Sequence, residues 1–173
     1  MLKLVAILAM VFPALLMAQS PADALFDKYS GQDGFTSVYI TQAMFSLFAD
    51  VDTDEDESGF MDLVKNLKSI KILTVDHDST MKAPQVNFYS EIMKDFPKSK
   101  YEELMVVKKS DQDVTFYIRK EGKIISELLM VIGGKGDNAL ISIQGDIDLK
   151  SISKLSHSLN IEGMENLEEI DKK

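Results

Sequence analysis

The stretch Val114-Thr115-Phe116-Tyr117-Ile118-Arg119 decides the fold class, because Val114, Phe116 and Ile118 recur at every second position. A period of two is typical of a β-strand that buries one face. Similar strands are predicted at 101–108, 124–132 and 139–143, and the connections between them are short enough for hairpins. This part of the chain therefore predicts an antiparallel meander of four strands.

The remaining segments mix helices and strands. The predicted helices share apolar residues at three-four spacing and lie at 21–29, 42–49, 61–67, 84–96 and 149–159. Two early strands are predicted at 35–40 and 70–75. Strand runs separated from helix runs predict an α+β fold, with one mainly antiparallel sheet of about six strands and helices packed over it. The two early strands could pair in parallel through a right-handed helical crossover.

The first 18 residues have the pattern of a secretory signal peptide. Lys3 is their only charge, an apolar run of about 14 residues extends from Leu4 to Met17, and Ala18 is a small residue at the predicted cleavage point. The run is shorter than the roughly 20 residues that a membrane-spanning helix needs. We expect cleavage after Ala18, a periplasmic or secreted product, and no stable membrane insertion after cleavage. An uncleaved N-terminal anchor is the alternative.

The composition of the rest of the chain points to one soluble domain and excludes several chemistries. No repeat or linker divides it, so 19–160 predicts a single domain and 161–173 a charged tail. The absence of cysteine excludes disulfides, thiolate nucleophiles and cysteine-zinc sites. The whole sequence has 28 acidic and 19 basic side chains and a formal net charge of −9; without the leader and its Lys3 the charge is 18 − 28 = −10. Such a polyanion is not expected to bind nucleic acid.

The acidic segment 50–59 is the main candidate for metal binding. Asp50, Asp52 and Asp54 match the first, third and fifth positions of an EF-hand calcium loop. The sixth position should be glycine but is Glu55, and the twelfth should be glutamate but is Met61. The segment is therefore not an EF-hand. Two interpretations of the segment remain: the three aspartates bind calcium loosely, or the segment is a solvated loop without a bound ion.

The chain's two histidines and its glycine-rich segment show no catalytic pattern. His77 lies in an Asp-His-Asp run, whose adjacent side chains would point to opposite faces of a strand, and His157 lies on the late helix between two serines. We interpret both as surface residues. Residues 133–137 lack the hydroxyl and the following helix that a phosphate-binding loop requires, so they predict a hairpin turn. No cofactor is expected.

The strand at 124–132 is unusual because its second half is apolar on both faces. A sheet with one wet face should alternate apolar and polar residues. Either the chain's own helices cover both faces, or one face contacts a partner or lipid. The expected partners are an unknown envelope protein or a small apolar ligand.

Several segments together resemble a known family. They are 25–31, 36–41, 70–75, Ile125-Ser126-Glu127-Leu128-Leu129 and the segment from Leu140 to Leu149. In order and spacing these segments resemble the domain-of-unknown-function 4252 family (DUF4252) of exported proteins from Gram-negative bacteria. The resemblance implies no catalytic residue, since the family has no assigned activity. Some of its members look like lipoproteins, from which this cysteine-free chain departs. An association of the family with extracytoplasmic sigma factors implies a regulatory alternative.

From these observations we expect a non-enzymatic binding or protein-interaction module of the cell envelope. A regulator of envelope signalling, linked to an extracytoplasmic sigma factor, is one alternative. A hydrolase whose site is assembled by the fold is another, and it predicts a pocket that contains His77 or His157 with convergent carboxylates.

Overall fold

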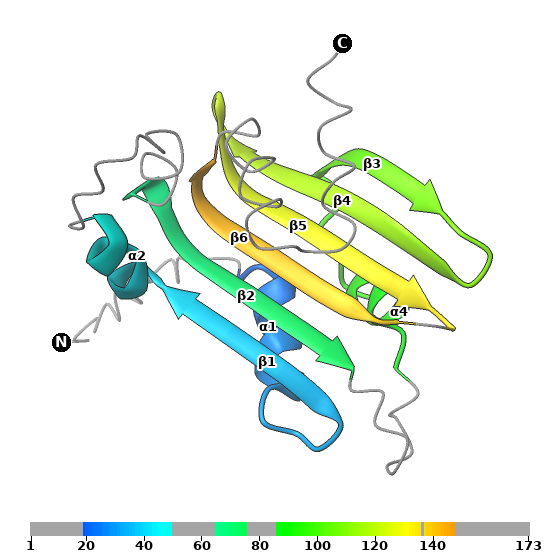
Figure 1. Ribbon diagram of the computed structural model, residues 1–173. Helices are drawn as coiled ribbons and strands as arrows, with labels where there is room; N and C mark the ends of the chain where they lie inside the picture. The colour runs from blue at the N-terminus through cyan, green and yellow to red at the C-terminus, as the bar shows by residue number, and fades with distance from the viewer. Residues whose placement is uncertain (1–18, 50–64, 76–85, 136, 148–173) are drawn as a thin grey trace, which may run out of the picture.

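The computed structural model describes residues 19–49, 65–75, 86–135 and 137–147, which form a six-stranded antiparallel sheet with helices on both faces (Figure 1). The helices are α1 (Pro21–Tyr29), α2 (Gln42–Ala49) and α4 (Phe88–Met93). The strands are β1 (Phe35–Thr41), β2 (Leu67–Val75), β3 (Glu102–Lys108), β4 (Gln112–Glu121), β5 (Ile124–Gly134) and β6 (Ala139–Ile147). The predicted α+β class and single sheet are confirmed.

The strand order is β1-β2-β6-β5-β4-β3. Strands β3 to β6 form the predicted meander, in which each strand pairs with the next along the chain. The connection from β2 through α4 reaches the far edge of the sheet, so that the returning meander places β6 beside β2 (Figure 1). Both β1 and β3 are therefore edge strands.

Parallel pairing of the two early strands is wrong. β1 and β2 pair in antiparallel register, with Thr41 opposite Ser69 and Phe35 opposite Val75. The chain thus leaves β1 and enters β2 at the same end of the sheet. A parallel pair would require the connection to cross the length of the sheet, whereas this helical connection returns to the end where it began.

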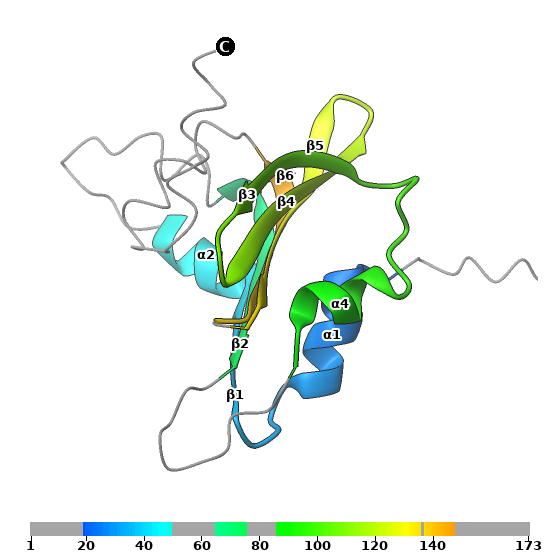
Figure 2. The same cartoon turned by 90° about the vertical axis from the view of Figure 1, so that its right-hand side faces the viewer.

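Helices α1 and α4 lie on one side of the sheet and α2 lies on the other (Figure 2). Each face of the sheet has its own apolar core. The face under α1 and α4, here called the α1/α4 face, includes Leu129 and Val131 of β5. The opposite face, here called the α2 face, includes Leu128 and Met130 of β5 together with Phe45 of α2. All four β5 side chains are buried. The strand is therefore apolar on both sides because the chain itself covers both sides.

Local sequence signals explain where α1 and α4 begin. The Ser20 hydroxyl caps α1 by accepting from the backbone N–H of Ala22, and Pro21 occupies the first turn. The side chain of Asn87 caps α4 in the same way. The start of α4 packs directly on Gly133, where an added Cβ would lie 2.6 Å from Cβ of Tyr89. Gly133 thus allows close packing. Gly133 and Gly134 are the last two residues of β5 and pair with β4, so the strand extends into the segment 133–137 that was predicted as a turn.

Several sequence predictions fall on residues outside the described ranges. These are the leader at 1–18, the acidic segment with Asp50, Asp52 and Asp54, both histidines, the late helix and the charged tail. Within the described ranges, the helices are all too short or too polar to span a lipid bilayer.

Candidate functional site

A fully buried carboxylate lies on the α1/α4 face of the sheet, on the inner strand β5. Glu127 of β5 has no exposed surface. It is followed along the strand by two core residues, Leu128 and Leu129, so a charged side chain lies within an apolar segment. An isolated carboxylate in such surroundings would be strongly destabilising. Its surroundings must therefore supply both a counter-charge and hydrogen-bond donors.

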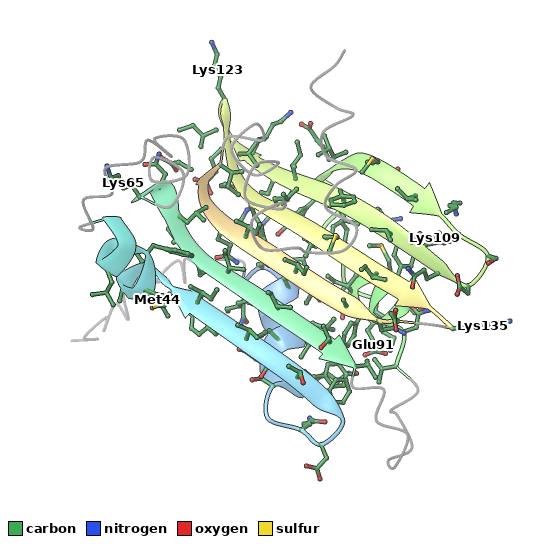
Figure 3. All side chains as sticks on the ribbon, in the orientation of Figure 1. Met44, Lys65, Glu91, Lys109, Lys123 and Lys135 are labelled. Atoms are coloured by element: carbon green, nitrogen blue, oxygen red, sulfur yellow. The ribbon has the colours of Figure 1, made fainter. Side chains whose placement is uncertain are left out.

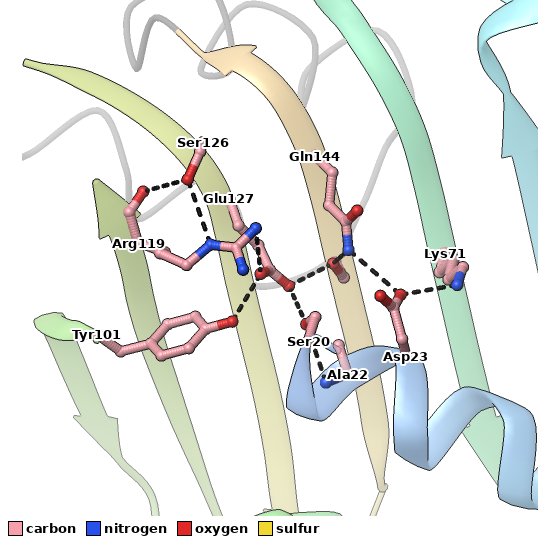
Figure 4. Close-up of polar contacts among 10 residues, drawn as sticks. Ser20, Ala22, Asp23, Lys71, Tyr101, Arg119, Ser126, Glu127 and Gln144 are labelled. Carbon is pink, nitrogen blue, oxygen red and sulfur yellow. Dashed lines mark hydrogen bonds and ion pairs between the residues drawn. The ribbon is translucent and has the colours of Figure 1, made fainter. Parts of the chain in front are cut away.

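Three hydroxyl groups and one guanidinium surround Glu127 (Figure 4). The hydroxyls of Ser20 and Ser142 donate to Oε1 over 2.6 and 2.8 Å, respectively. The hydroxyl of Tyr101 donates to Oε2 over 2.7 Å, and Nη2 of Arg119 lies 3.6 Å from the same oxygen. Among the described residues, no buried side-chain nitrogen or oxygen lacks a hydrogen-bond partner. The buried carboxylate is thus fully compensated.

The antiparallel register explains how the strands contribute to this cluster. Arg119 lies opposite Glu127 across the β4–β5 pair, and Gln144 lies opposite Glu127 across the β5–β6 pair. Gln144 in turn lies opposite Ser69 of β2. Directly opposite residues share a face, so a row of polar side chains crosses four strands of the α1/α4 face.

The first turn of α1 contacts two strands of this row, β6 and β2. Oδ1 of Asp23 accepts from Nε2 of Gln144 over 3.2 Å and from Nζ of Lys71 over 2.7 Å (Figure 4). Nζ of Lys71 also lies 5.4 Å from the ring centroid of Phe26 and 5.1 Å from that of Tyr39. The helix start is therefore attached to the sheet by Ser20 at one point and by Asp23 at another.

Tyr101 remains a hydrogen-bond donor over the whole physiological pH range. Burial raises the pKa of its hydroxyl well above the usual value near 10, and the negative charge of Glu127 raises it further. A phenolate facing a carboxylate would be repelled in this setting. The Tyr101 hydroxyl accordingly keeps its proton and its orientation toward Oε2.

A cleft of about 740 Å³ opens directly above the cluster. Its lining comes from the start of α1, the segment entering β3 and the end of β4: Gln19, Ser20, Asp23, Ser99, Lys100, Tyr101, Glu102, Arg119, Lys120 and Glu121. Three of the four residues that contact Glu127 belong to this lining, namely Ser20, Tyr101 and Arg119. Glu127 itself lies beneath the lining and does not reach the cleft surface.

The charges in the cleft are only partly paired. Lys120 forms an ion pair with Glu102 at 2.7 Å, and Asp23 is held by Lys71. Lys100 and Glu121 form no ion pair with any described residue. Arg119 lines the cleft and its side chain is 24% exposed. Its Nε donates to the Ser126 hydroxyl at 3.3 Å and its Nη2 faces Glu127, so Nη1 is the part of the guanidinium that no described residue engages.

Sequence reasoning did not identify this cluster. The candidate site residues predicted from the sequence were Asp50, Asp52 and Asp54, as calcium ligands. These three residues lie outside the described ranges. Within the described ranges no group of three or more potential metal ligands occurs. The signal that could have found the cluster is Glu127, a charged residue inside the apolar strand that the family resemblance had singled out. Ser20, Tyr101 and Arg119 carry no comparable signal.

Comparison with known proteins gives a family and no close relative. Neither the curated proteins nor the solved structures contain a significant match to the chain. The family model described as "Domain of unknown function (DUF4252)" matches residues 29–155, which include Tyr101, Arg119, Glu127 and Ser142 but not Ser20. Since the match covers most of the chain, this protein belongs to the DUF4252 family.

Proposed function

We propose that this domain is a non-enzymatic binding module of the cell envelope and that its ligand occupies the cleft above Glu127. One observation carries the proposal: three of the four groups that contact the buried carboxylate are also cleft residues. A fully buried charge is costly, and we infer that Glu127 is retained because it holds other groups in place. Three of the groups that it holds, on Ser20, Tyr101 and Arg119, belong to residues that line the cleft.

Fixed side chains favour binding because they lose little conformational freedom when a ligand arrives. The Tyr101 hydroxyl and the Arg119 guanidinium are both oriented by Glu127 from below. Ser20 is held twice, since its hydroxyl donates to Glu127 and accepts from Ala22. The cleft is therefore shaped before any ligand binds.

The charges of the cleft favour a small zwitterionic ligand, such as an amino acid or a short peptide. Lys100 and Arg119 offer positive charge to a ligand carboxylate, and Glu121 offers a carboxylate to a ligand ammonium group. The volume of about 740 Å³ lies within the range of small-ligand sites. The charged lining favours a polar ligand over the small apolar ligand expected from the sequence.

The geometry of Glu127 supports binding rather than catalysis. Both of its oxygens are occupied by hydroxyl donors, and none of its surface is accessible to a substrate. A general base must come within hydrogen-bond reach of the proton that it removes. Glu127 is therefore a positioning residue in this proposal.

Calorimetric titration with trialanine tests the ligand class. We expect heat on addition of trialanine, and weaker binding of its C-terminal amide and of its N-acetyl derivative, because each lacks one of the two charges. Lys100→Gln should weaken trialanine binding by roughly tenfold or more, since a hydrogen bond to a charged group contributes about 1.5–3 kcal/mol. Lys108→Gln is the matched control, because Lys108 is an exposed lysine outside the cleft.

Two results would contradict this function. The first is the absence of binding at millimolar trialanine. The second is equal binding of the three peptides, which would show that neither terminal charge is recognised. Lys100 is exposed and does not contact Glu127, so we expect Lys100→Gln to leave the buried cluster intact.

The envelope location in this proposal is supported by the pattern of residues 1–18. Expression in a Gram-negative host followed by osmotic release should give a periplasmic product whose first residue is Gln19. N-terminal sequencing of the released protein checks this. A product that stays in the cytoplasm with Met1 attached would refute it.

A further inference from the structure

The two edge strands of the sheet differ in how they are protected against pairing with another strand. β3 has a register irregularity between Glu103 and Met105 and carries Glu102, Glu103 and Lys108. Irregularities and charges are devices by which natural proteins prevent edge-to-edge association. β1 has neither: it is seven residues long, its register with β2 is uninterrupted, and it contains no charged residue and no proline.

Exposed apolar side chains gather at the same edge. Six large hydrophobic residues are exposed among those described, and four of them lie on β1 or on α2, which follows it directly. On β1, Val38 is 40% and Tyr39 is 56% exposed. On α2, Met44 and Leu47 are exposed, and Figure 3 shows Met44 beyond the end of β1. The unprotected edge thus lies next to apolar surface.

We propose that β1 pairs in antiparallel fashion with β1 of a second copy of this chain, so that the two sheets become continuous. Full overlap of two Phe35–Thr41 strands places Val38 opposite Val38 of the other copy, because Val38 is the central residue. Each Ser37 then faces Tyr39 of the other copy, and no charged pair is brought together. The strand is therefore complementary to itself.

The composition of the strand also permits a second copy as the occupant. β1 contains no charged residue, so antiparallel pairing of two β1 strands brings no like charges opposite each other. Pairing along an edge satisfies backbone groups of both strands, and an isologous contact of this kind closes as a dimer.

This interface is independent of the proposed ligand site. The cleft is lined by the start of α1, the segment entering β3 and the end of β4, whereas β1 lies at the opposite edge of the sheet (Figure 1). Loss of dimerisation therefore need not change peptide binding, and loss of peptide binding need not change dimerisation.

Sedimentation equilibrium of the purified chain, from roughly 1 µM to 1 mM, tests the proposal. We expect a reversible dimer. Val38→Lys should raise its dissociation constant at least about tenfold, because two lysines would face each other across the interface. Val38→Glu should do the same. An equimolar mixture of the Val38→Lys and Val38→Glu chains should dimerise again, which also shows that both variants are folded.

Val106→Lys is the matched control, because Val106 is 37% exposed on the other edge strand. This variant should dimerise like the unmodified chain. The proposal is overturned if the unmodified chain stays monomeric throughout the concentration range, if Val106→Lys weakens the dimer as much as Val38→Lys, or if the mixed variants fail to associate.

Discussion

Replacing Glu127 with glutamine tests the central feature of the site, because the change preserves shape and removes one charge. The amide oxygen can keep the bonds from Ser20 and Ser142 if it takes the place of Oε1. The amide nitrogen then faces Tyr101, whose hydroxyl can rotate to accept, and Arg119, which has only donors. Glu127→Gln therefore leaves the guanidinium without its anionic partner.

The expected cost follows from these contacts. A hydrogen bond to a charged group contributes about 1.5–3 kcal/mol, and removing one partner of a fully buried ion pair costs about 3–5 kcal/mol. Arg119 is 24% exposed, so water replaces part of what it loses. We expect Glu127→Gln to lower the free energy of unfolding by about 2–4 kcal/mol, measured by urea denaturation followed by circular dichroism.

The matched control is Glu121→Gln, which removes the same charge from an exposed cleft residue and should change stability by about 0.5 kcal/mol or less. A double-mutant cycle with Arg119→Met isolates the pair, and we expect a coupling energy of about 1 kcal/mol or more. A loss below about 1 kcal/mol for Glu127→Gln, or strictly additive effects in the cycle, would refute the view that Glu127 organises the cleft.

Three further changes probe other parts of the structure. Gly145 has φ +147° and an added Cβ would lie 2.3 Å from a backbone oxygen, so Gly145→Ala should cost about 2–4 kcal/mol in urea denaturation. The hydrogen bond from Lys28 lowers the pKa of Glu91 to about 2. The ionised Glu91 therefore stabilises the fold above about pH 4.5, and this stabilisation is lost as the pH falls toward 2. Glu91→Gln should make acid denaturation less steep in that range. Burial raises the pKa of both Tyr101 and Tyr117 in the folded protein. Above about pH 10 these tyrosines ionise only in the unfolded chain, so stability should fall there, and ultraviolet titration should show both ionising only on unfolding. Tyr117→Phe should move this unfolding to higher pH.

The meander was predictable from sequence because its strands are joined by short connections. The alternation from Val114 to Ile118 identifies β4, and hairpin connections leave antiparallel pairing with its neighbours as the simple outcome. The pairing of β1 with β2 was not predictable in the same way. A connection of 25 residues, from 42 to 66, can either cross the sheet or return to the same end, and hydrophobic periodicity does not distinguish these paths.

The cluster around Glu127 was not predictable because its members are distant in sequence and ordinary in type. Tyr101 precedes an edge strand, Ser20 resembles any helix cap, and Arg119 ends the alternating stretch of β4 two residues before the strand itself ends. Sequence patterns report which face of an element is buried, but not which side chains from other elements meet there. Only Glu127 broke its local pattern, and its partners required the strand register and the docking of α1.

The separation of these partners has a structural consequence. The hydroxyl of Ser20 lies 107 positions from Glu127 along the chain, whereas Ser142 lies 15 positions away on the adjacent strand. The strands of the meander thus satisfy only part of the carboxylate, and the donor from Ser20 is present only when α1 is docked on the sheet. An apolar contact would tolerate small shifts of that helix, but a hydrogen bond of 2.6 Å to a buried charge does not. Glu127 thus selects one position for the start of α1. Because that start is also a wall of the cleft, the same bond that fixes the helix sets the shape of the proposed binding site.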